Sequence, residues 1–233
     1  NQKRLSEMKT DFINNMTHEF KTPIATISLA LDAMSNPLAL KDPERLLKYS
    51  QMIRQENHRM NKQVEEVLRL AMLDKNELEL TFITKDLHQI LQEVIQRFSL
   101  SIESKGGKLE VDFQATESLI KVDPSQMEAV FQNLVDNAIK YSPNNLEIFI
   151  RTTNRNDQIF VEVEDRGMGM KPEVQRQIFE KFYRSETGNV HNIKGHGLGL
   201  AFVKSMIELH QGNIQVKSIF GQGSLFTLNL PTV

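Results

Sequence analysis

The sequence contains no cysteine among its 233 residues. This absence excludes a disulfide framework and any metal site built on thiolates. It is compatible with a reducing compartment, where disulfides are rare. The sequence also lacks an apolar run long enough to span a bilayer and lacks a signal-peptide pattern. It therefore predicts no direct membrane contact for this stretch of chain.

An excess of charge of either sign is missing too. Lys and Arg number 28 and Asp and Glu number 30, which gives a formal net charge of -2. A broad basic surface for nucleic acid is therefore not expected. The hydrophobic content of 39% and charged content of 25% are ordinary for a globular protein, and the length allows one large domain or two small ones. Because the chain opens in helix-like sequence without Met, we expect a fragment of a longer protein.

Residues 1 to about 34 have the apolar spacing of one long amphipathic helix that contains Pro23. Proline cannot donate to the carbonyl four residues earlier, so we expect a bend one turn after His18. The helix should not end there, because its periodicity resumes at once. A second helix is predicted from about 43 to 73, capped by Asp42. Its apolar residues include a strict seven-residue series: Leu46, Ile53, Met60 and Val67.

Two long amphipathic helices joined by a short loop predict an antiparallel hairpin. One hairpin buries only one stripe of each helix. Pairing of two copies into a four-helix bundle would bury the rest, so residues 1–75 are predicted to be a homodimerisation module. The alternative is that the exposed stripe packs against the C-terminal part of the same chain.

Residues 76–233 have a different texture, in which short strand-like segments alternate with helices. Asp123 and Pro124 form a typical helix start, with Asp as N-cap and Pro at the first helical position. The predicted strands are 78–84, 108–114, 119–122, 146–153, 158–164, 213–219 and 224–230, and the predicted helices are 86–104, 124–141, 172–178 and 198–211. This order predicts an α+β two-layer sandwich with helices on one face of a mixed sheet.

The predicted helix 124–141 carries an unusual polar face. Asn133, Asn137, Lys140 and Tyr141 are spaced by four, seven and eight residues from the first of them. Asparagine is a poor helix former, so two of them one turn apart need a reason. A metal ion with phosphates supplies one, because amide oxygens can act as ligands and lysine can pair with phosphate. A solvated helix face is the alternative.

The segment Asp165-Arg-Gly167-Met-Gly169 follows a predicted strand. Its glycines would let the backbone approach a planar ligand closely, and Asp165 could accept a hydrogen bond from an exocyclic amine. The alternative is a turn that ends the strand.

A second glycine cluster, Gly195-His-Gly197-Leu198-Gly199, opens a predicted helix. Free backbone amides at a helix N-terminus can bind phosphate. The cluster does not lie in a βαβ unit, which argues against a Rossmann site, and no P-loop lysine motif occurs. Together the clusters predict a nucleotide pocket.

A nucleotide pocket needs a phosphate acceptor, and His18 is the candidate. A histidine on an amphipathic helix is usually a surface residue, so the pocket downstream is what favours this role. Glu19 is placed to accept a hydrogen bond from one ring nitrogen and so to fix the tautomer. Thr22 follows one helical turn later, where its hydroxyl could hold a water or bond back to the carbonyl of His18.

The whole set resembles the cytoplasmic catalytic core of a two-component sensor histidine kinase. The motifs occur in the family's order: His18-Glu19-x-x-Thr22-Pro23, Asn133…Asn137, Asp165-x-Gly167-x-Gly169, Phe179-Glu-Lys-Phe182-Tyr-Arg184 and Gly195-x-Gly197-x-Gly199. Five matched motifs cover nearly the whole chain. The resemblance implies the Bergerat ATP-binding fold shared with gyrase B and Hsp90.

The resemblance also implies a role for each residue of the pocket. Asn133 would hold Mg²⁺, and Asn137 would contact ATP and its metal-bound phosphates. Lys140 would pair with phosphate, Tyr141 would lie along the adenine, and Asp165 would bind the adenine amine. The wall around the adenine would be shaped by Gly167 and Gly169.

The remaining motif residues would belong to a lid, about residues 183–197. Its anchors would be Phe179, Phe182 and Arg184. Its phosphate-facing hinge would consist of Gly195, Gly197, Leu198 and Gly199. His191, Lys194 and His196 also lie in the lid and are more typical of solvated lid residues than of catalysts, although Lys194 could touch phosphate.

By resemblance, the chain is expected to phosphorylate itself on His18 from ATP and pass the phosphoryl group to an aspartate of a response regulator. Regulator phosphatase activity and a membrane-anchored parent protein are implied as well. One alternative is a gyrase- or Hsp90-type conformational ATPase, which would use a catalytic glutamate in helix 124–141, but the glutamate of that helix, Glu128, precedes Asn133, and the hairpin would be unexplained. The other is a catalytically silent dimeric scaffold, against which the intact motifs weigh.

Overall fold

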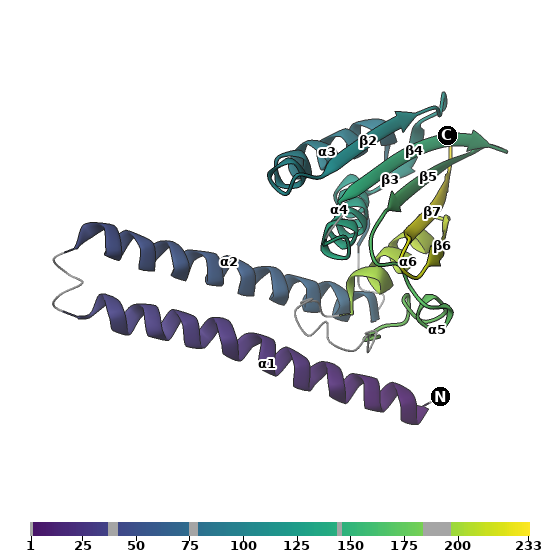
Figure 1. The fold of residues 1–233 in the computed structure, drawn as a ribbon. Coiled ribbons are helices and arrows are strands. Elements are labelled where there is room, and N and C mark those ends of the chain that lie inside the picture. The colour runs from purple at the N-terminus through teal and green to yellow at the C-terminus, as the bar shows by residue number, and fades with distance from the viewer. Residues whose placement is uncertain (1, 37–41, 75–78, 144–145, 184–196) are drawn as a thin grey trace. The chain divides into compact units, whose positions relative to one another are not determined.

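The computed structural model of the chain describes residues 2–36, 42–74, 79–143, 146–183 and 197–233 (Figure 1). The chain divides into two compact units, residues 1–76 and 77–233. Each unit is described below by itself.

The first unit is a hairpin of two long helices, α1 (Gln2–Met34) and α2 (Pro43–Asp74). Helix α1 continues through Pro23, as the periodicity predicted. Asp42 caps α2, because its Oδ1 accepts a hydrogen bond from the backbone N–H of Arg45 at 3.1 Å. The predicted helical hairpin is confirmed.

The hairpin leaves much of its apolar surface exposed. Among its described side chains, the buried ones are Met16, Pro23, Ala30 and Gln63. The exposed large apolar side chains are Ile13, Ile24, Leu29, Leu31, Leu47, Val64 and Leu68. These exposed apolar side chains are available for contact with another protein surface.

The second unit is built on a five-stranded sheet of order β2-β4-β5-β7-β6. Strand β2 runs parallel to β4, and the other neighbours are antiparallel, so the sheet is mixed as predicted. The strands are β2 (Lys108–Phe113), β4 (Glu147–Arg155), β5 (Gln158–Asp165), β6 (Asn213–Ile219) and β7 (Gly223–Pro231). A separate antiparallel pair joins β1 (Ile83–Asp86) to β3 (Leu119–Val122).

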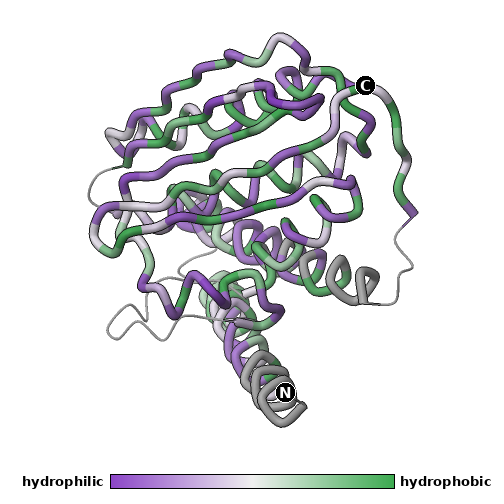
Figure 2. The backbone as a smooth tube through the Cα atoms, turned by 90° about the vertical axis from the view of Figure 1, so that its right-hand side faces the viewer, coloured by the Kyte–Doolittle hydropathy of each residue, from purple (hydrophilic) through white to green (hydrophobic). Residues whose placement is uncertain are grey.

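Three helices pack on this sheet: α3 (Leu87–Ser104), α4 (Pro124–Lys140) and α6 (Gly199–Leu209). Burial alternates along β5, where Ile159, Val161 and Val163 are buried and the residues between them are not. Figure 2 shows the same alternation of hydrophobic and hydrophilic residues along the strands. One face of the sheet is therefore core and the other is not, and the predicted two-layer sandwich is confirmed.

Some predicted boundaries are wrong. Strand β1 begins at Ile83 rather than at 78, and the N–H of Thr81 donates to the side chain of Asp123 instead of to a neighbouring strand. Helix α5 (Pro172–Gln175) is four residues long and gives way to turns before residue 178. The turn between β4 and β5 contains Asn156 and Asp157, whose φ values of 50° and 56° are those that a type I′ hairpin turn requires.

Candidate nucleotide site and phospho-acceptor histidine

Helix α4 is held at its start by Asp123. The Oδ1 atom of Asp123 accepts hydrogen bonds from the backbone N–H groups of Ser125 and Gln126, both at 3.1 Å. Its Oδ2 accepts from the N–H of Thr81 at 3.0 Å. Burial alone would raise the pKa of Asp123, but these hydrogen bonds, together with one from the Ser125 hydroxyl, lower it below its ordinary value. A charged cap therefore fixes the helix that carries the predicted polar face.

The four predicted residues lie on the less buried face of α4 or at its C-cap: Asn133, Asn137, Lys140 and Tyr141. The opposite face carries the core residues Met127, Val130, Phe131, Leu134, Val135 and Ala138. The Asn133 Nδ2 donates to the carbonyl of Ala129 at 2.8 Å, which fixes the direction of the amide. Its Oδ1 faces the first residue of α6, because a Cβ on Gly199 would lie 2.5 Å from it. Within the described residues, the side-chain amide of Asn137 makes no hydrogen bond.

Lys140 and Tyr141 lie together at the end of α4. The Nζ of Lys140 is 5.2 Å from the centroid of the Tyr141 ring, which is a cation–π distance. Tyr141 is partly exposed, and its carbonyl accepts a hydrogen bond from the N–H of Met168 at 2.9 Å. This bond joins the end of α4 to the first glycine cluster.

Asp165 ends β5 with its side chain 6% exposed. Its Oδ1 accepts from the N–H of Gly167 at 2.9 Å, and Ser224 lies directly opposite on β7. Burial raises the pKa of Asp165, and hydrogen bonds from Gly167 and Ser224 offset part of that effect. None of the ion pairs among the described residues involves this carboxylate. It is therefore a buried acceptor that a ligand donor would stabilise.

Three oxygen atoms lie close around Gly167, where a side chain would not fit. A Cβ at this position would lie 2.3 Å from the carbonyl of Tyr141, 2.6 Å from the Ser142 hydroxyl and 2.8 Å from Oδ1 of Asp165. The Ser142 hydroxyl is buried and has no hydrogen-bond partner among the described residues. Ser142 is not among the predicted site residues, although its place directly after Tyr141 is a signal. An orphaned buried hydroxyl beside Asp165 fits a site that receives a polar ligand.

The loop after Asp165 packs closely on the β6–β7 turn. Gly169 has φ of +62°, and a Cβ there would lie 2.0 Å from the carbonyl of Ile219. Gly223 has φ of +120°, and a Cβ there would lie 1.9 Å from the carbonyl of Asp165. Gly223 therefore lies directly against the backbone of Asp165, a contact between distant segments that no local sequence pattern indicates.

The predicted lid is described only at its two ends. Phe179 packs edge-on against Phe226 with ring centroids 6.4 Å apart, and Phe182 has φ of +69°. Gly197 also has φ of +69°, Leu198 is buried, and Gly199 begins α6. The predicted residues Arg184, His191, Lys194, Gly195 and His196 lie outside the described residues. The N-cap residue of α6 is Leu198, and within the described residues it provides no side-chain hydrogen bond to the helix. The backbone N–H groups in the first turn of α6 therefore suit an anion.

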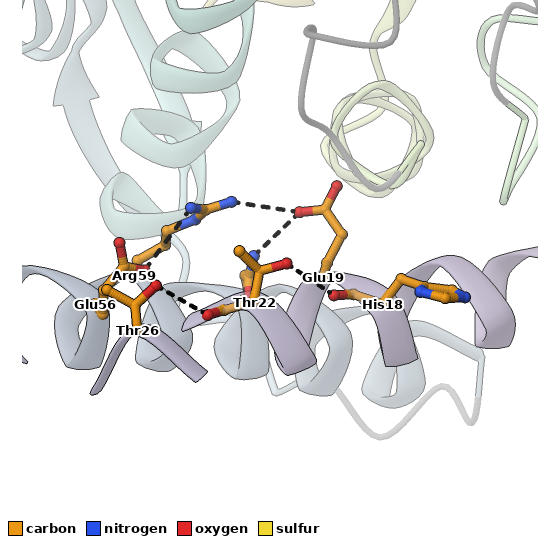
Figure 3. A network of polar contacts seen from close by, with 7 residues as sticks. His18, Glu19, Thr22, Thr26, Glu56 and Arg59 are labelled. Carbon is orange, nitrogen blue, oxygen red and sulfur yellow. Dashed lines mark hydrogen bonds and ion pairs between the residues drawn. The ribbon is translucent and has the colours of Figure 1, made fainter. Parts of the chain in front are cut away.

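His18 is exposed on α1, and its imidazole points away from the carboxylate of Glu19 (Figure 3). The Glu19 Oε2 lies instead 3.6 Å from a guanidinium nitrogen of Arg59 and 3.4 Å from Nε2 of Gln63. The expected hydrogen bond between Glu19 and the imidazole is not formed in this arrangement. The Thr22 hydroxyl donates to the carbonyl of His18 at 3.4 Å, a long contact that corresponds to the structural alternative for this residue.

No group of three or more His, Cys, Asp or Glu side chains is arranged to hold a metal ion in the part of the chain that the structure describes. The site therefore offers no all-protein metal cage among these residues, and Mg²⁺ is typically held by few protein oxygens together with the phosphates of a substrate. Among the described helices, none combines the length and apolar character needed to cross a membrane.

The fold and site define a class: a helical hairpin with an exposed histidine, followed by a nucleotide-binding sandwich. Sequence comparison matches both parts. Residues 8–76 match the family described as His Kinase A (phospho-acceptor) domain. Residues 122–233 match the family described as Histidine kinase-, DNA gyrase B-, and HSP90-like ATPase.

Known proteins agree with this match. The chain is 41% identical over 232 residues to the sensor protein RprX of Bacteroides fragilis, covering 99% of this chain and 45% of RprX. It is 32% identical over 231 residues to the sensor-like histidine kinase SenX3 of Mycobacterium tuberculosis, covering 99% of this chain and 55% of SenX3. It therefore spans about half the length of these relatives.

A solved structure of histidine kinase ThkA in complex with the response regulator protein TrrA matches with a TM-score of 0.70 and 25% identity, over 100% of this chain and 64% of that one. The chain belongs to the sensor histidine kinases and corresponds to their catalytic core.

Proposed function

We propose that this chain is a protein-histidine kinase that binds ATP in residues 77–233 and transfers the γ-phosphoryl group to His18. The observation that carries the proposal is the presence of both reaction partners in one chain: an exposed histidine on the hairpin, and a buried acceptor site that fits a purine amine. A nucleotide site without an acceptor histidine would not support a histidine kinase, and neither would an exposed histidine without a nucleotide site.

The adenine side of the site is Asp165 with its neighbours. A buried carboxylate that lacks a cation among the described residues is stabilised by a hydrogen-bond donor such as the adenine amine. The Ser142 hydroxyl supplies a second polar group, and Gly167 keeps the wall free of a side chain. Tyr141, partly exposed at the end of α4, offers a ring along which adenine can lie.

The phosphate side consists of the polar face of α4 and the start of α6. The Oδ1 of Asn133 is oriented by its own Nδ2 bond and would hold Mg²⁺, while the amide of Asn137 would contact ATP and its phosphates. Lys140 would pair with a phosphate oxygen. A bound Mg²⁺ would neutralise charge that develops on the phosphates during transfer. Separate Asn133→Ala and Asn137→Ala variants, titrated with ATP with and without Mg²⁺, show which amide the metal dependence follows.

The acceptor side is His18. Its neutral ring nitrogen attacks the γ-phosphorus, a nitrogen–phosphorus bond forms, and the bond to the ADP oxygen breaks. The other ring nitrogen then carries positive charge, which a carboxylate turned toward it stabilises by accepting the ring N–H hydrogen bond. Glu19, the next residue, is the group that can do so.

Two partners follow from this function. Exposed apolar side chains on α1 and α2 support a homodimer that buries them in a four-helix bundle. A response regulator supplies the aspartate that receives the phosphoryl group, and the ThkA–TrrA complex supports this kind of partner. The regulator would lie over the strip of α1 that contains His18, Thr22, Thr26 and Leu29, where Leu29 is 69% exposed.

Incubation with γ-labelled ATP, followed by mapping of the labelled residue, tests the function directly. The His18→Gln variant should lose all label, while ATP binding stays at the wild-type level because the pocket lies in the other unit. The label should be acid-labile and alkali-stable, as a phosphoramidate is. His58→Gln, an exposed histidine on α2, is the matched control and should be labelled normally. An acid-stable label, or labelling of the His18→Gln variant, would contradict the assignment.

The gyrase-type alternative requires a glutamate of α4 that is available to activate water. Glu128 is instead engaged by Arg97, with a nitrogen–oxygen distance of 2.6 Å, and by Nε2 of Gln132 at 2.8 Å. An acid paired in this way is a poor base for a nucleotide reaction, which favours phosphoryl transfer to His18.

A further inference from the structure

The carboxylate of Glu19 is held from the second helix of the hairpin (Figure 3). Two side chains of α2 meet the same oxygen, Oε2: Nη2 of Arg59 at 3.6 Å and Nε2 of Gln63 at 3.4 Å. The side chain of Glu19 is 16% exposed, so these contacts are partly shielded from water. The acid that the proposed reaction needs beside the imidazole is thus engaged elsewhere.

Gln63 is the deeper of the two partners, with 5% of its surface exposed. Its Oε1 is buried and has no hydrogen-bond partner among the described residues. Burying an amide is costly unless it makes hydrogen bonds. Among the described residues, the contact to Glu19 is the one hydrogen bond that this side chain makes. The position of Gln63 is therefore better explained by an action on Glu19 than by the stability of the hairpin.

Arg59 lies between two carboxylates at nearly equal distances. Its Nη2 is 3.6 Å from Glu19 on α1, and its Nη1 is 3.8 Å from Oε2 of Glu56 on its own helix. The Oε2 of Glu56 is buried and accepts no hydrogen bond among the described residues. If Glu19 leaves, the guanidinium still has Glu56 as an anion, so the release of Glu19 does not strand a half-buried charge.

The distances in these contacts are also long. Hydrogen bonds between charged groups are typically about 2.7–2.9 Å long, well below the distances at Arg59. Arg59 and Gln63 stand four residues apart, so they lie on one face of α2 and move together when α2 rotates or slides against α1. Both properties suit a contact that exchanges during function.

We propose that Arg59 and Gln63 form a latch on Glu19 that restrains the kinase reaction. The proposal rests on the function proposed above. With the latch closed, the carboxylate stays on α2 and the imidazole lacks its acceptor. With the latch open, Glu19 turns to His18, accepts the ring hydrogen bond and supports attack on the γ-phosphorus. Arg59 and Gln63 are positioning residues, because they act through Glu19 and touch no substrate.

The latch predicts opposite effects from two charge-removing substitutions on α2. Arg59→Ala should raise the single-turnover rate of autophosphorylation at saturating ATP about fivefold, as loss of a partly exposed ion pair allows. Glu56→Gln should lower that rate, because Arg59 then has Glu19 as its remaining anion. The KM for ATP should not change in either variant. Damage to the hairpin would lower the rate in both.

Arg54→Ala and Glu65→Gln are matched controls, since both residues are exposed on α2. They should leave the rate unchanged. In a Glu19→Ala background, Arg59→Ala should have no effect, because the latch has nothing to hold. An Arg59→Ala rate equal to or below that of the labelled wild-type chain overturns the latch but leaves the proposed function intact. If the wild-type chain takes no label on His18, the proposed function fails, and the latch with it.

Discussion

The two units differ in how tightly they hold their polar groups. On the hairpin, Glu19 is held by contacts of 3.4 and 3.6 Å from another helix, and His18 is exposed. In the sandwich, Asp165 is buried, accepts a 2.9 Å bond from Gly167, and is backed by a glycine at which no side chain fits. The hairpin is thus arranged for side chains that change partners, and the sandwich for a ligand that meets a preformed site.

The largest effect is expected for Asp165→Asn, which tests whether the sandwich contains a preformed adenine site. Loss of the charged acceptor for the adenine amine should weaken ATP binding by about 1.5–3 kcal/mol, or more than tenfold. The nucleotide-free protein should not be destabilised, because burial raises the pKa of Asp165 and the charged form is costly there. Calorimetric titration and thermal unfolding of the same variant measure the two quantities.

Ser218→Ala is a suitable control for Asp165→Asn, since Ser218 bonds to Gly223 and Met170 beside the site without lying at Asp165 itself. It should change stability more than ATP affinity. Unchanged ATP affinity of a folded Asp165→Asn protein would mean that adenine is placed elsewhere.

On the hairpin, Thr22 should separate two activities. Autophosphorylation has no use for its hydroxyl, whereas removing phosphate from a regulator's aspartate needs a water held in line with the phosphorus. Thr22→Ala should therefore autophosphorylate normally and lose most of its phosphatase activity, because the attacking water is no longer held in line with the phosphorus. Release of phosphate from a phosphorylated regulator is the measurement.

Thr17→Ala is the matched control for Thr22→Ala, because Thr17 also donates its hydroxyl to a carbonyl one turn back, that of Ile13 at 2.8 Å, and lies outside the strip proposed for the regulator. It should leave both activities unchanged. If both activities fall together in Thr22→Ala, the hydroxyl serves the helix next to Pro23, as its bond to the carbonyl of His18 would suggest.

The smallest effect concerns pH and belongs to the sandwich. His210 is 3% exposed, donates from Nδ1 to the carbonyl of Met206, and accepts at Nε2 from the N–H of Asp123 at 3.0 Å. Burial lowers the pKa of His210 below the ordinary value of 6.5. The unfolded chain therefore takes up the proton first as pH falls. The stability that neutral His210 contributes is complete above pH 6.5 and declines below it.

Urea unfolding at pH 7.5 and 5.5 measures this effect, and His210→Phe should reduce the difference between the two values. Asp165 has a raised pKa and contributes with the opposite sign, so the comparison is best made in Asp165→Asn protein. His88, whose pKa burial also lowers, adds a contribution of the same sign that a His88→Gln variant removes. An equal pH dependence with and without His210 would exclude its role.

Local sequence was enough to predict most of the elements and the identity of the candidate site. Apolar periodicity gave the two long helices, and Asp42 and Asp123 marked helix starts, because caps and periodicity depend on neighbours in the chain. Local sequence predicted the start of β1 wrongly. Residues 79–82 alternate like a strand, but the N–H of Thr81 donates to the side chain of Asp123, 42 residues away. Burial and long-range hydrogen bonds override local propensity at such positions.

By itself, the sequence determined which residues are predicted to carry the chemistry, since motif spacing selects His18, Asn133, Asn137 and Asp165 and places each on a predicted helix or at the end of a predicted strand. Only the tertiary structure decided their surroundings. It brought Ser142, Gly223 and Ser224 to Asp165, and it placed Arg59 and Gln63 on Glu19 across the hairpin. The physical reason is that burial and charge partners arise from segments far apart in the chain. These surroundings decide whether a carboxylate can accept a hydrogen bond from a ligand, as at Asp165, or is engaged by other side chains, as at Glu19.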